Sequence, residues 1–335
     1  MFEYIKIENS SVPKYQQIIN SIISAIRDNQ LKLNTKIPSL NFMMKEYNLS
    51  QDTVLNAYNH LKAQGIITSQ VGKGYYVCNT AVQRKHKIFV LFDNYTNYKE
   101  NLFNAMIDSL GKSGELDLYF HHNKESVFKH LIDSANGLYT AYIIMPTLKK
   151  DMDQFIIDTL PVKSVYILDR TSPMLSRKYP FVCQNFETDI YAAFKRNAKS
   201  ILKYRKVRFF SDSNRIHIRQ ISKGIQKFTK EQGLDFSNEK ITNSLKIEMA
   251  DIIICLNDRD LVKFVKHARS QNLQMGLDFG IVSYNETDLK QIIGNGITTI
   301  STDFELMGKS VINMIVHKER KRIYNKSMFL IRKSI

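Results

Sequence analysis

The chain has 335 residues, 43% of them hydrophobic and 24% charged, which predicts two or three folding units and argues against a disordered or fibrous protein. Three widely separated cysteines, Cys78, Cys183 and Cys255, form no CxxC pair, which argues against a disulfide scaffold or a thiolate zinc site. The formal net charge of +16 favours a polyanionic partner, but residues 1–80 hold only 8 basic and 5 acidic side chains, and the other 40 basic and 27 acidic ones lie in residues 81–335.

The N-terminus carries charges at Glu3, Lys6 and Glu8, where a signal peptide requires an unbroken apolar region. Apolar runs such as residues 88–92 are also far shorter than the about eighteen residues of a membrane-spanning helix. We therefore expect a cytoplasmic protein whose cysteines stay reduced.

Three helices are predicted near residues 13–26, 39–48 and 50–65. Pro13 lies near the start of the first, Ser50 is a good N-cap for the third, and Gly65 closes it. Their apolar residues recur at three- and four-residue spacing, the one-sided stripe of an amphipathic helix. Examples are Ile18, Ile22 and Ile26 in the first helix, Leu40, Met43, Met44 and Tyr47 in the second, and Val54, Ala57, Tyr58 and Leu61 in the third.

After Gly65 the pattern changes from a helical period to β-branched and aromatic residues. Ile66-Ile67-Thr68 and Tyr75-Tyr76-Val77 flank the tip Val71-Gly72-Lys73-Gly74, which predicts a β-hairpin. Three helices and a glycine-tipped hairpin indicate a winged helix-turn-helix, whose third helix enters the major groove of DNA. A small helical bundle with a hairpin appendage is the alternative interpretation of the same periodicity.

The order and spacing of these residues resemble the DNA-binding head of GntR-family regulators over about residues 11–78. The segments that carry the resemblance include Lys36-Ile37-Pro38-Ser39, Tyr47-Asn48-Leu49-Ser50-Gln51-Asp52-Thr53-Val54 and Gly72-Lys73-Gly74-Tyr75-Tyr76-Val77. Together with the predicted wing, the resemblance implies these DNA-binding residues: Lys36, Ser39, Asn41, Ser50, Gln51, Asp52, Thr53, Leu55, Asn56, Val71, Gly72 and Lys73.

The chain departs from the family at positions where arginine is common, which Asn41, Gln51 and Leu55 occupy here. Asparagine and glutamine pair best with adenine, so these residues and Asn56 predict an operator half-site richer in A·T than is usual for the family. Each residue also has a purely structural interpretation. Ser50 is first of all a helix cap, the glycines are needed by any tight hairpin, and Lys73 can simply be solvated.

From residue 85 onward, short apolar runs alternate with amphipathic stretches, which predicts parallel sheets covered by helices on both faces. The number of runs indicates two such sheets. The runs lie at residues 88–92, 116–120, 142–145, 162–168, 207–210, 252–256 and 279–283.

Polar residues follow several of these runs, at the carboxyl edge of a parallel sheet where ligands bind in such folds. Each residue alone is as well explained as a helix cap or turn residue, but their recurrence predicts the rim of a ligand cleft. The chain has no tryptophan, so ring stacking on a ligand must come from tyrosine or phenylalanine, with Tyr95 and Tyr284 as the candidates. The predicted effector-binding residues are Asp93, Asn94, Tyr95, Asp169, Arg170, Asn257, Asp258, Tyr284 and Asn285. His121-His122 has no partner at metal-ligand spacing, and we expect the pair on the surface.

The chain resembles the C-terminal half of LacI/GalR-type effector domains, which share the fold of type 1 periplasmic sugar-binding proteins, most strongly over about residues 276–334. The segments that carry this resemblance are Phe279-Gly280-Ile281-Val282-Ser283-Tyr284-Asn285, Gly296-Ile297-Thr298-Thr299-Ile300, Asp303, Met307-Gly308 and Phe329-Leu330-Ile331-Arg332-Lys333-Ser334. In the resembled fold the last of these segments crosses between two lobes.

We therefore predict an α+β winged helix-turn-helix domain over residues 1–80, a linker over 81–86, and an α/β periplasmic-binding-protein-like (type 1) domain of two doubly wound lobes over 87–335. The expected function is a transcription regulator that binds double-stranded operator DNA as a homodimer and responds to a small molecule, with a carbohydrate implied by the resemblance. We expect no cofactor, metal or catalytic residue. An architectural DNA-binding protein without an effector is one alternative. An enzyme on a doubly wound fold is another, which the absence of GxSxG, HExxH and phosphate-loop motifs disfavours.

Overall fold

The computed structural model describes residues 2–9, 12–80, 86–211, 215–241 and 246–335. They group into two compact units. One unit comprises Met1–Phe89 with Lys112–Asp117 and His130–Ala141, and the other comprises Val90–Gly111, Leu118–Lys129 and Tyr142–Ile335. Residues 81–85 of the predicted linker lie outside the described residues, and its last residue, His86, already belongs to strand β3 (His86–Phe92).

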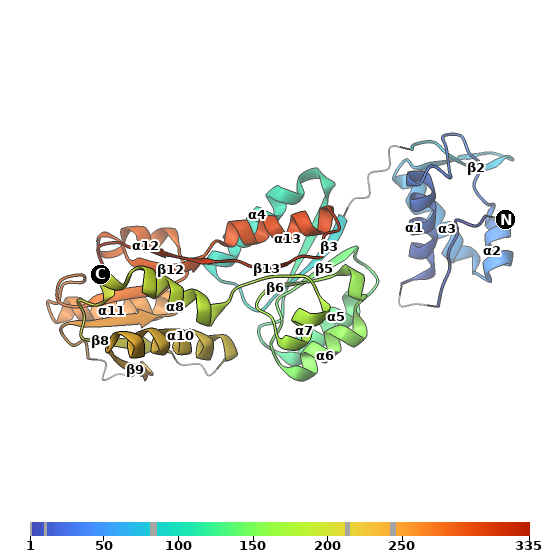
Figure 1. Ribbon diagram of the computed structural model, residues 1–335. Coiled ribbons are helices and arrows are strands. Elements are labelled where there is room, and N and C mark those ends of the chain that lie inside the picture. The colour runs from blue at the N-terminus through green and yellow to red at the C-terminus, as the bar shows by residue number, and fades with distance from the viewer. Residues whose placement is uncertain (1, 10–11, 81–85, 212–214, 242–245) are drawn as a thin grey trace. The chain divides into compact units, whose positions relative to one another are not determined.

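The N-terminal region has the three helices and the hairpin that the sequence predicts (Figure 1). These elements are α1 (Lys14–Arg27), α2 (Leu40–Tyr47), α3 (Gln51–Ala63), β1 (Ile67–Gln70) and β2 (Gly74–Val77). The two strands are antiparallel, with Ile67 opposite Val77 and Gln70 opposite Gly74. The predicted winged helix-turn-helix is therefore confirmed.

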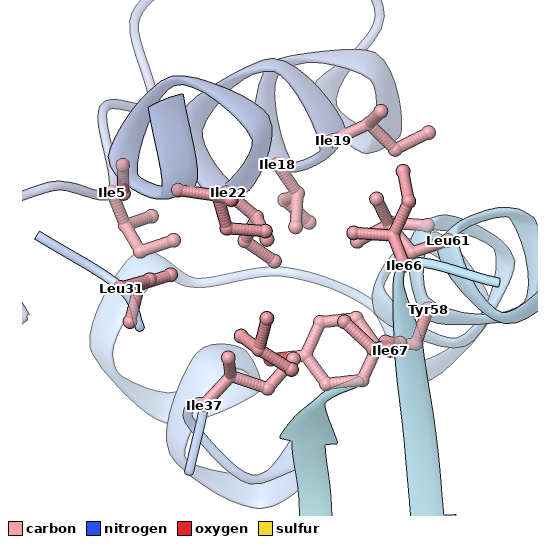
Figure 2. Packing of buried hydrophobic residues seen from close by; sticks show 14 of the residues in the cluster. Ile5, Ile18, Ile19, Ile22, Leu31, Ile37, Tyr58, Leu61, Ile66 and Ile67 are labelled. Atoms are coloured by element: carbon pink, nitrogen blue, oxygen red, sulfur yellow. The ribbon is translucent and has the colours of Figure 1, made fainter. Parts of the chain in front are cut away.

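The core of this region fixes the orientation of α3. Figure 2 shows Ile18 and Ile22 of α1 packed with Tyr58 and Leu61 of α3 and with Ile67 of β1. All five are at most 2% exposed, and burying a side chain of this size contributes about 1.5–3 kcal/mol. The Tyr58 hydroxyl also donates a hydrogen bond of 2.7 Å to the carbonyl of residue 38. With its apolar side held inward, α3 presents its opposite face to solvent.

The described residues from 86 onward form two six-stranded sheets. The first has the order β13-β7-β6-β5-β3-β4 and the second β14-β12-β11-β10-β8-β9. Neighbours run parallel in every pair whose register is defined except β12 with β14, which is antiparallel. The strands are β4 (Gly114–Phe120), β5 (Ala141–Ile144), β6 (Val165–Asp169), β7 (Phe181–Cys183), β8 (Lys206–Phe210), β9 (Asp235–Glu239), β10 (Asp251–Cys255), β11 (Gly280–Tyr284), β12 (Thr298–Thr302), β13 (Arg322–Tyr324) and β14 (Ser327–Leu330).

Helices connect these strands, as expected for two doubly wound lobes. They are α4 (Asn97–Leu110), α5 (Glu125–Ala135), α6 (Lys150–Thr159), α7 (Pro173–Lys178), α8 (Phe186–Arg196), α9 (Ala198–Ile201), α10 (Ile216–Gln232), α11 (Asp258–Ser270), α12 (Asp288–Ile292) and α13 (Phe304–Val316), with short 3-10 turns at Gly111–Ser113, Val162–Ser164 and Ile293–Asn295.

Three crossings link the two sheets. The chain leaves the first sheet after β7, returns after β12, and crosses again between β13 and β14. Helix α13 packs against α4, far away in sequence, so closely that a Cβ at Gly308 would lie 2.5 Å from the carbonyl oxygen of Leu102. The expectation that residues 329–334 cross between lobes is wrong. Ser327–Leu330 pairs with β12 inside the second sheet, and the crossing lies between Tyr324 and Ser327.

The seven predicted strands are present, with small differences at their ends. Residues 162–164, predicted as part of a strand, form a 3-10 turn, and β6 begins at Val165. Five strands had no apolar run of sufficient length to predict them: β7 and β13 have three residues each, β9 reads DFSNE, β12 reads TTIST and β14 reads SMFL. Pairing with neighbours, rather than local pattern, makes these segments strands.

Candidate functional site

Helices α2 and α3 each begin with a serine N-cap. The Ser39 hydroxyl accepts a hydrogen bond from the backbone N–H of Phe42 at 3.2 Å, and the Ser50 hydroxyl accepts one from that of Thr53 at 3.3 Å. Between the two helices Asn48 takes a left-handed conformation, with φ of 50°. Both serines are thus caps, and any contact that they make with DNA is an additional role.

The residues predicted to contact DNA are largely open to solvent. Ten of the twelve are exposed, and Thr53 and Leu55 are half-buried. Asp52 and Asn56 lie on the side of α3 opposite its buried face, and Gln51 and Leu55 lie on its flanks. At the wing tip Gly72 and Gly74 have φ of 71° and 108°, which a glycine adopts without the steric cost that a Cβ brings.

The wing brings a second lysine close to its tip. A Cβ placed on Gly74 would lie 3.2 Å from Cε of Lys36, so the Lys36 side chain runs along the wing towards the turn that carries Lys73. Val71 beside it is fully exposed. The arrangement therefore presents two ammonium groups and one apolar side chain on a loop narrow enough to approach a nucleic-acid backbone.

A cleft with a volume of about 1230 Å³ lies at the carboxyl ends of the strands of both sheets. It exceeds the roughly 300–1000 Å³ that is usual for small-molecule pockets. Asp93 does not line the cleft directly but lies behind Arg170. The other eight predicted effector-binding residues do line it: Asn94, Tyr95, Asp169, Arg170, Asn257, Asp258, Tyr284 and Asn285.

A buried network of charged side chains forms the half of the cleft that belongs to the first sheet. Arg170 donates from Nη2 to Oδ2 of Asp93 at 2.5 Å and from Nε to Oδ2 of Asp169 at 3.1 Å. Lys99 of α4 is hydrogen-bonded to the other oxygen of Asp93, and Gln184 donates to Oδ1 of Asp169 at 2.6 Å. All five are at most 7% exposed. Two acids and two bases balance, so the network has no net charge.

The pKa values of the network follow from this pairing. Burial by itself raises the pKa of Asp93, but Arg170 and Lys99 outweigh it and hold the pKa of that carboxyl well below its usual range. Burial likewise lowers the pKa of Arg170, while Asp93 and Asp169 raise it above its usual range. The ion pair therefore stays charged at every physiological pH.

His217, at the start of α10, faces the same guanidinium from across the cleft. Its Nδ1 lies 3.4 Å from Nη1 of Arg170. Burial, followed by the positive charge of Arg170, lowers the pKa of His217 to about 4. A neutral imidazole with an acceptor nitrogen towards Arg170 is the form that this geometry favours at neutral pH.

Helix caps and backbone contacts build the other half of the cleft, at the second sheet. Oδ1 of Asn257 accepts from the N–H of Asp260 at 2.9 Å, and its Nδ2 donates to Oδ2 of Asp260 at 2.7 Å. Lys290, 2% exposed, donates to the carbonyls of Tyr284 and Asn285 at 2.9 and 2.6 Å and pairs with Asp258 at 3.0 Å. Asn257 therefore acts as the cap of α11, and Asp258 balances a buried lysine.

Several polar atoms on residues of the cleft wall have no hydrogen-bond partner in the described part of the chain. Among them are Oε1 of Gln184, Oδ1 of Asn285 and Oγ1 of Thr287. Leaving a buried acceptor unsatisfied costs about 1–3 kcal/mol, so each atom gains when a ligand or a water supplies a donor. Because Nε2 of Gln184 already donates to Asp169, its free end is the acceptor. The cleft is thus prepared for a ligand rich in hydroxyl or amine donors.

The two tyrosines predicted to stack on a ligand differ in exposure. Tyr95 is 64% exposed, whereas Tyr284 is 5% exposed, with its hydroxyl beside that of Ser327. Phe186, which the sequence prediction missed, also lines the cleft with its ring centroid 5.6 Å from that of His217. Tyr95 therefore offers more ring surface than Tyr284 or Phe186, since Phe186 is only 6% exposed.

The expectation that His121 lies on the surface is wrong, since its side chain is fully buried. Its Nδ1 accepts from the N–H of Asn123 at 3.1 Å, and its Nε2 lies 3.2 Å from the carbonyl of Met145. Burial lowers the pKa of His121 to about 4. The imidazole is thus a neutral structural group that ties the loop after β4 to the end of β5.

Sequence reasoning missed four residues that line the cleft, Gln184, His217, Thr287 and Lys290, and Lys99 of the network behind its wall. One signal was available. Lys99 lies in the first turn of a helix, where a cation opposes the helix dipole, and such a lysine needs a compensating acid like the one six residues earlier. No described helix is long and apolar enough to span a membrane, and no three His, Cys, Asp or Glu residues in the described ranges are grouped to hold a metal ion.

The fold and the cleft define a helix-turn-helix domain joined to a two-lobed α/β ligand-binding fold. Residues 14–77 match the family model of bacterial regulatory proteins of the gntR family, and residues 201–331 match that of the periplasmic binding protein-like domain. The chain therefore carries a gntR-type DNA-binding domain followed by a periplasmic-binding-protein-like domain.

Two curated relatives are transcriptional regulators of Bacillus subtilis (strain 168). An uncharacterized HTH-type regulator, YdfD, is 35% identical over 68 residues, which cover 20% of this chain and 14% of YdfD. The HTH-type regulator GmuR is 28% identical over 127 residues, 38% of this chain and 52% of GmuR. The match thus spans at most about half the length of these two relatives.

Solved structures share the two-lobed fold. A putative transcription regulator from Staphylococcus saprophyticus superimposes with a TM-score of 0.61 and 16% identity, over 75% of this chain and 98% of that one. A periplasmic binding protein/LacI transcriptional regulator from Alkaliphilus metalliredigens, complexed with D-xylulofuranose, does so with a TM-score of 0.59 and 11% identity, over 74% and 98%. At these identities the likeness concerns the fold.

Proposed function

We propose that this chain is a dimeric, sequence-specific DNA-binding transcription regulator whose DNA affinity is controlled by a small polyhydroxylated ligand, a sugar or sugar derivative. Residues 1–80 bind the operator, and residues 87–335 bind the ligand and form the dimer. One observation carries the proposal. A single chain joins an outward-facing recognition helix to a cleft whose walls hold polar acceptors without partners.

The exposed face of α3 and the wing support the DNA-binding part. Gln51 and Asn56 present amides that can pair with N6 and N7 of adenine, and Lys36 and Lys73 can contact phosphates. One such domain has a net charge of only +3 over residues 1–80. Because few phosphate contacts give weak binding, two heads on adjacent half-sites are needed for a specific complex.

The pairing of the buried charges of the cleft supports a neutral ligand. Arg170 is bound to two carboxylates, and Lys290 and Asp258 balance each other. The open positions, at Gln184 and Asn285, are acceptors for ligand hydroxyls. Arg170 therefore acts mainly to hold the wall of the cleft in place, and Asn285 is the better ligand anchor. The sugar bound by the similar Alkaliphilus protein is in keeping with this class.

Direct titration of duplex DNA with the full chain tests the proposal. Half-sites selected from a random duplex library should be rich in A·T, and Lys73→Ala should weaken binding to all sequences alike and reduce the salt dependence by about one phosphate contact. Lys199→Ala, which removes an exposed lysine of the C-terminal region, is the control. If the chain binds no duplex at low salt, the proposal that it is a DNA-binding regulator is wrong. If the selected half-sites are dominated by G·C, the proposal that Gln51 and Asn56 recognise adenine is wrong.

A thermal-shift screen of monosaccharides, sugar acids and nucleosides, followed by DNA titrations with each hit, tests the effector. A ligand can change DNA affinity only through its differential affinity for two arrangements of the dimer, and typical coupling of about 1–3 kcal/mol corresponds to roughly 5- to 150-fold. If every stabilising compound leaves the DNA affinity unchanged, the protein is an architectural DNA-binding protein instead.

A further inference from the structure

The positive charge of residues 81–335 gathers in part on one edge of the first sheet. Four exposed lysines lie there, Lys163, Lys178, Lys318 and Lys321. Three exposed arginines accompany them, Arg177, Arg320 and Arg322. The acids beside them are Glu319 and Asp158, so the cluster keeps a charge of about +5 by formal charges. We call these seven basic residues the basic edge.

Contacts between three segments that are distant in sequence hold the basic edge together. Arg320 donates to the backbone carbonyls of Lys163 and Val162 at 2.9 and 3.0 Å, and Arg322 donates to that of Arg177 at 2.7 Å. Neutral carbonyls, and no carboxylates, accept these bonds. The guanidinium groups are therefore fixed in place while their charges stay uncompensated, which is the state that favours contact with phosphates.

The basic edge lies at the opposite end of the strands from the cleft. Lys321 and Arg177 come just before β13 and β7, and Lys163 comes just before β6, whereas the cleft residues follow the carboxyl ends of these parallel strands. A ligand in the cleft therefore does not reach these lysines. A polyanion bound at the edge is a separate partner.

The chain enters the first sheet at the same end of its strands as the basic edge. Strand β3 ends at the cleft with Asp93, so its first residue, His86, lies at the opposite end, where the basic residues are. In sequence, only eight residues, 78–85, separate β2 from β3.

We propose that the basic edge contacts the phosphate backbone of the DNA that flanks the operator, as a second, sequence-independent DNA-binding surface. The inference rests on the proposed function. It also explains why an N-terminal region with a net charge of only +3 is followed by a region of strong positive charge. Each phosphate that the edge neutralises releases counterions, so its contribution must weaken with salt.

The test compares three forms of the full chain on two duplexes. One variant carries Lys163→Gln, Lys178→Gln, Lys318→Gln and Lys321→Gln, which leave the hydrogen-bonded arginines in place. The matched control carries Lys199→Gln, Lys223→Gln, Lys230→Gln and Lys266→Gln, four exposed lysines outside the edge with the same loss of charge. One duplex holds only the selected operator, and the other adds about fifteen base pairs on each side.

We expect the edge variant to bind the long duplex about tenfold or more weakly than the parent at low salt, with a salt slope shallower by about 2–4. On the short duplex it should bind like the parent, and the control variant should match the parent on both. Replacing the same four lysines by arginine should preserve the parent's behaviour. Equal losses in the edge and control variants, or an equal loss on both duplexes, would overturn the proposal. If the parent binds no duplex, the proposed function fails first and this inference falls with it.

Discussion

The polar side chains in the two halves of the cleft have different kinds of partners. At the first sheet, the side chains of Asp93, Lys99, Arg170 and Asp169 are buried and bind one another. At the second sheet, Asn257 caps a helix, Lys290 binds backbone carbonyls, and Asn285 keeps an unpartnered acceptor. The first half is thus a wall of paired charges, in which Oε1 of Gln184 still lacks a partner. In the second half, side chains bind groups that are close to them in sequence, and Oδ1 of Asn285 remains available to a ligand.

Arg170→Ala should give the largest effect, because it leaves the carboxylates of Asp93 and Asp169 buried with too little positive charge. Breaking a buried ion pair by removing one partner costs about 3–5 kcal/mol. Urea unfolding of the full chain measures this loss. Lys309→Ala, which breaks an exposed ion pair with Glu305, should cost less than about 0.5 kcal/mol. Similar losses of unfolding free energy in the two variants would mean that Arg170 is not part of a buried charge network that stabilises the first half of the cleft.

Low pH should destabilise the protein through the first half. Burial lowers the pKa of His121 to about 4 from an ordinary value near 6.5. The unfolded chain therefore binds the proton more readily, so the stabilisation is present above pH 6.5 and is lost as the pH falls towards 4. Between pH 7 and pH 5 this group alone should cost about 2 kcal/mol. The pKa of Asp93 is lowered too, but its contribution is lost only below about pH 4.

Denaturant unfolding at pH 7 and pH 5 of the parent and of His121→Gln measures the contribution of this histidine. Glutamine does not titrate and keeps an amide that can donate to the carbonyl of Met145. The variant should show a smaller pH dependence than the parent. An equal pH dependence in both proteins would mean that His121 is already protonated, or exposed, in the folded state.

The sequence predicted the positions of the cleft residues better than their partners. Polar residues after successive apolar runs mark strand ends at the carboxyl edge, and this rule placed eight of the nine predicted residues on the cleft wall. It could not show that Arg170 binds Asp93, 77 positions earlier, because only the strand order β6-β5-β3 brings them together. Gln184 was missed because the strand before it, β7, has just three residues and was not predicted.

His121 is a second example of a feature that depends on distant segments and that the local sequence does not predict. His121 follows an alternating strand and precedes a turn, which is typical of a surface residue, and only the packing of Phe128 against its ring reveals the burial. In the N-terminal region local signals were sufficient, because caps, glycines and helical periodicity act over four or five residues. In the two lobes the contacts that define the site join distant segments.

Asn257→Ala should have a smaller effect than the first two changes, because it removes a helix cap and not a charge. Loss of an asparagine N-cap costs about 0.5–2 kcal/mol, typically about 1. Asn257→Asp keeps an acceptor for the N–H of Asp260 and should recover part of the loss, limited by repulsion between the two carboxylates. Measuring the free energy of unfolding of the parent, Asn257→Ala and Asn257→Asp tests this prediction. If Asn257→Ala is neutral in stability yet abolishes ligand binding, the residue is a ligand contact and not a cap.

Asn285→Gly should change stability least and ligand binding most. Asn285 has φ of 61°, which glycine accepts readily and alanine does not, and its Oδ1 has no partner in the described structure. We expect the glycine variant to unfold within about 1 kcal/mol of the parent, and Asn285→Ala to be less stable because of its backbone. Both should bind the ligand about tenfold more weakly, since each lacks the same acceptor. Ligand titrations of the two variants separate backbone strain from the lost hydrogen bond. Unchanged affinity in the glycine variant would remove Asn285 from the ligand site and leave Gln184 as the main acceptor.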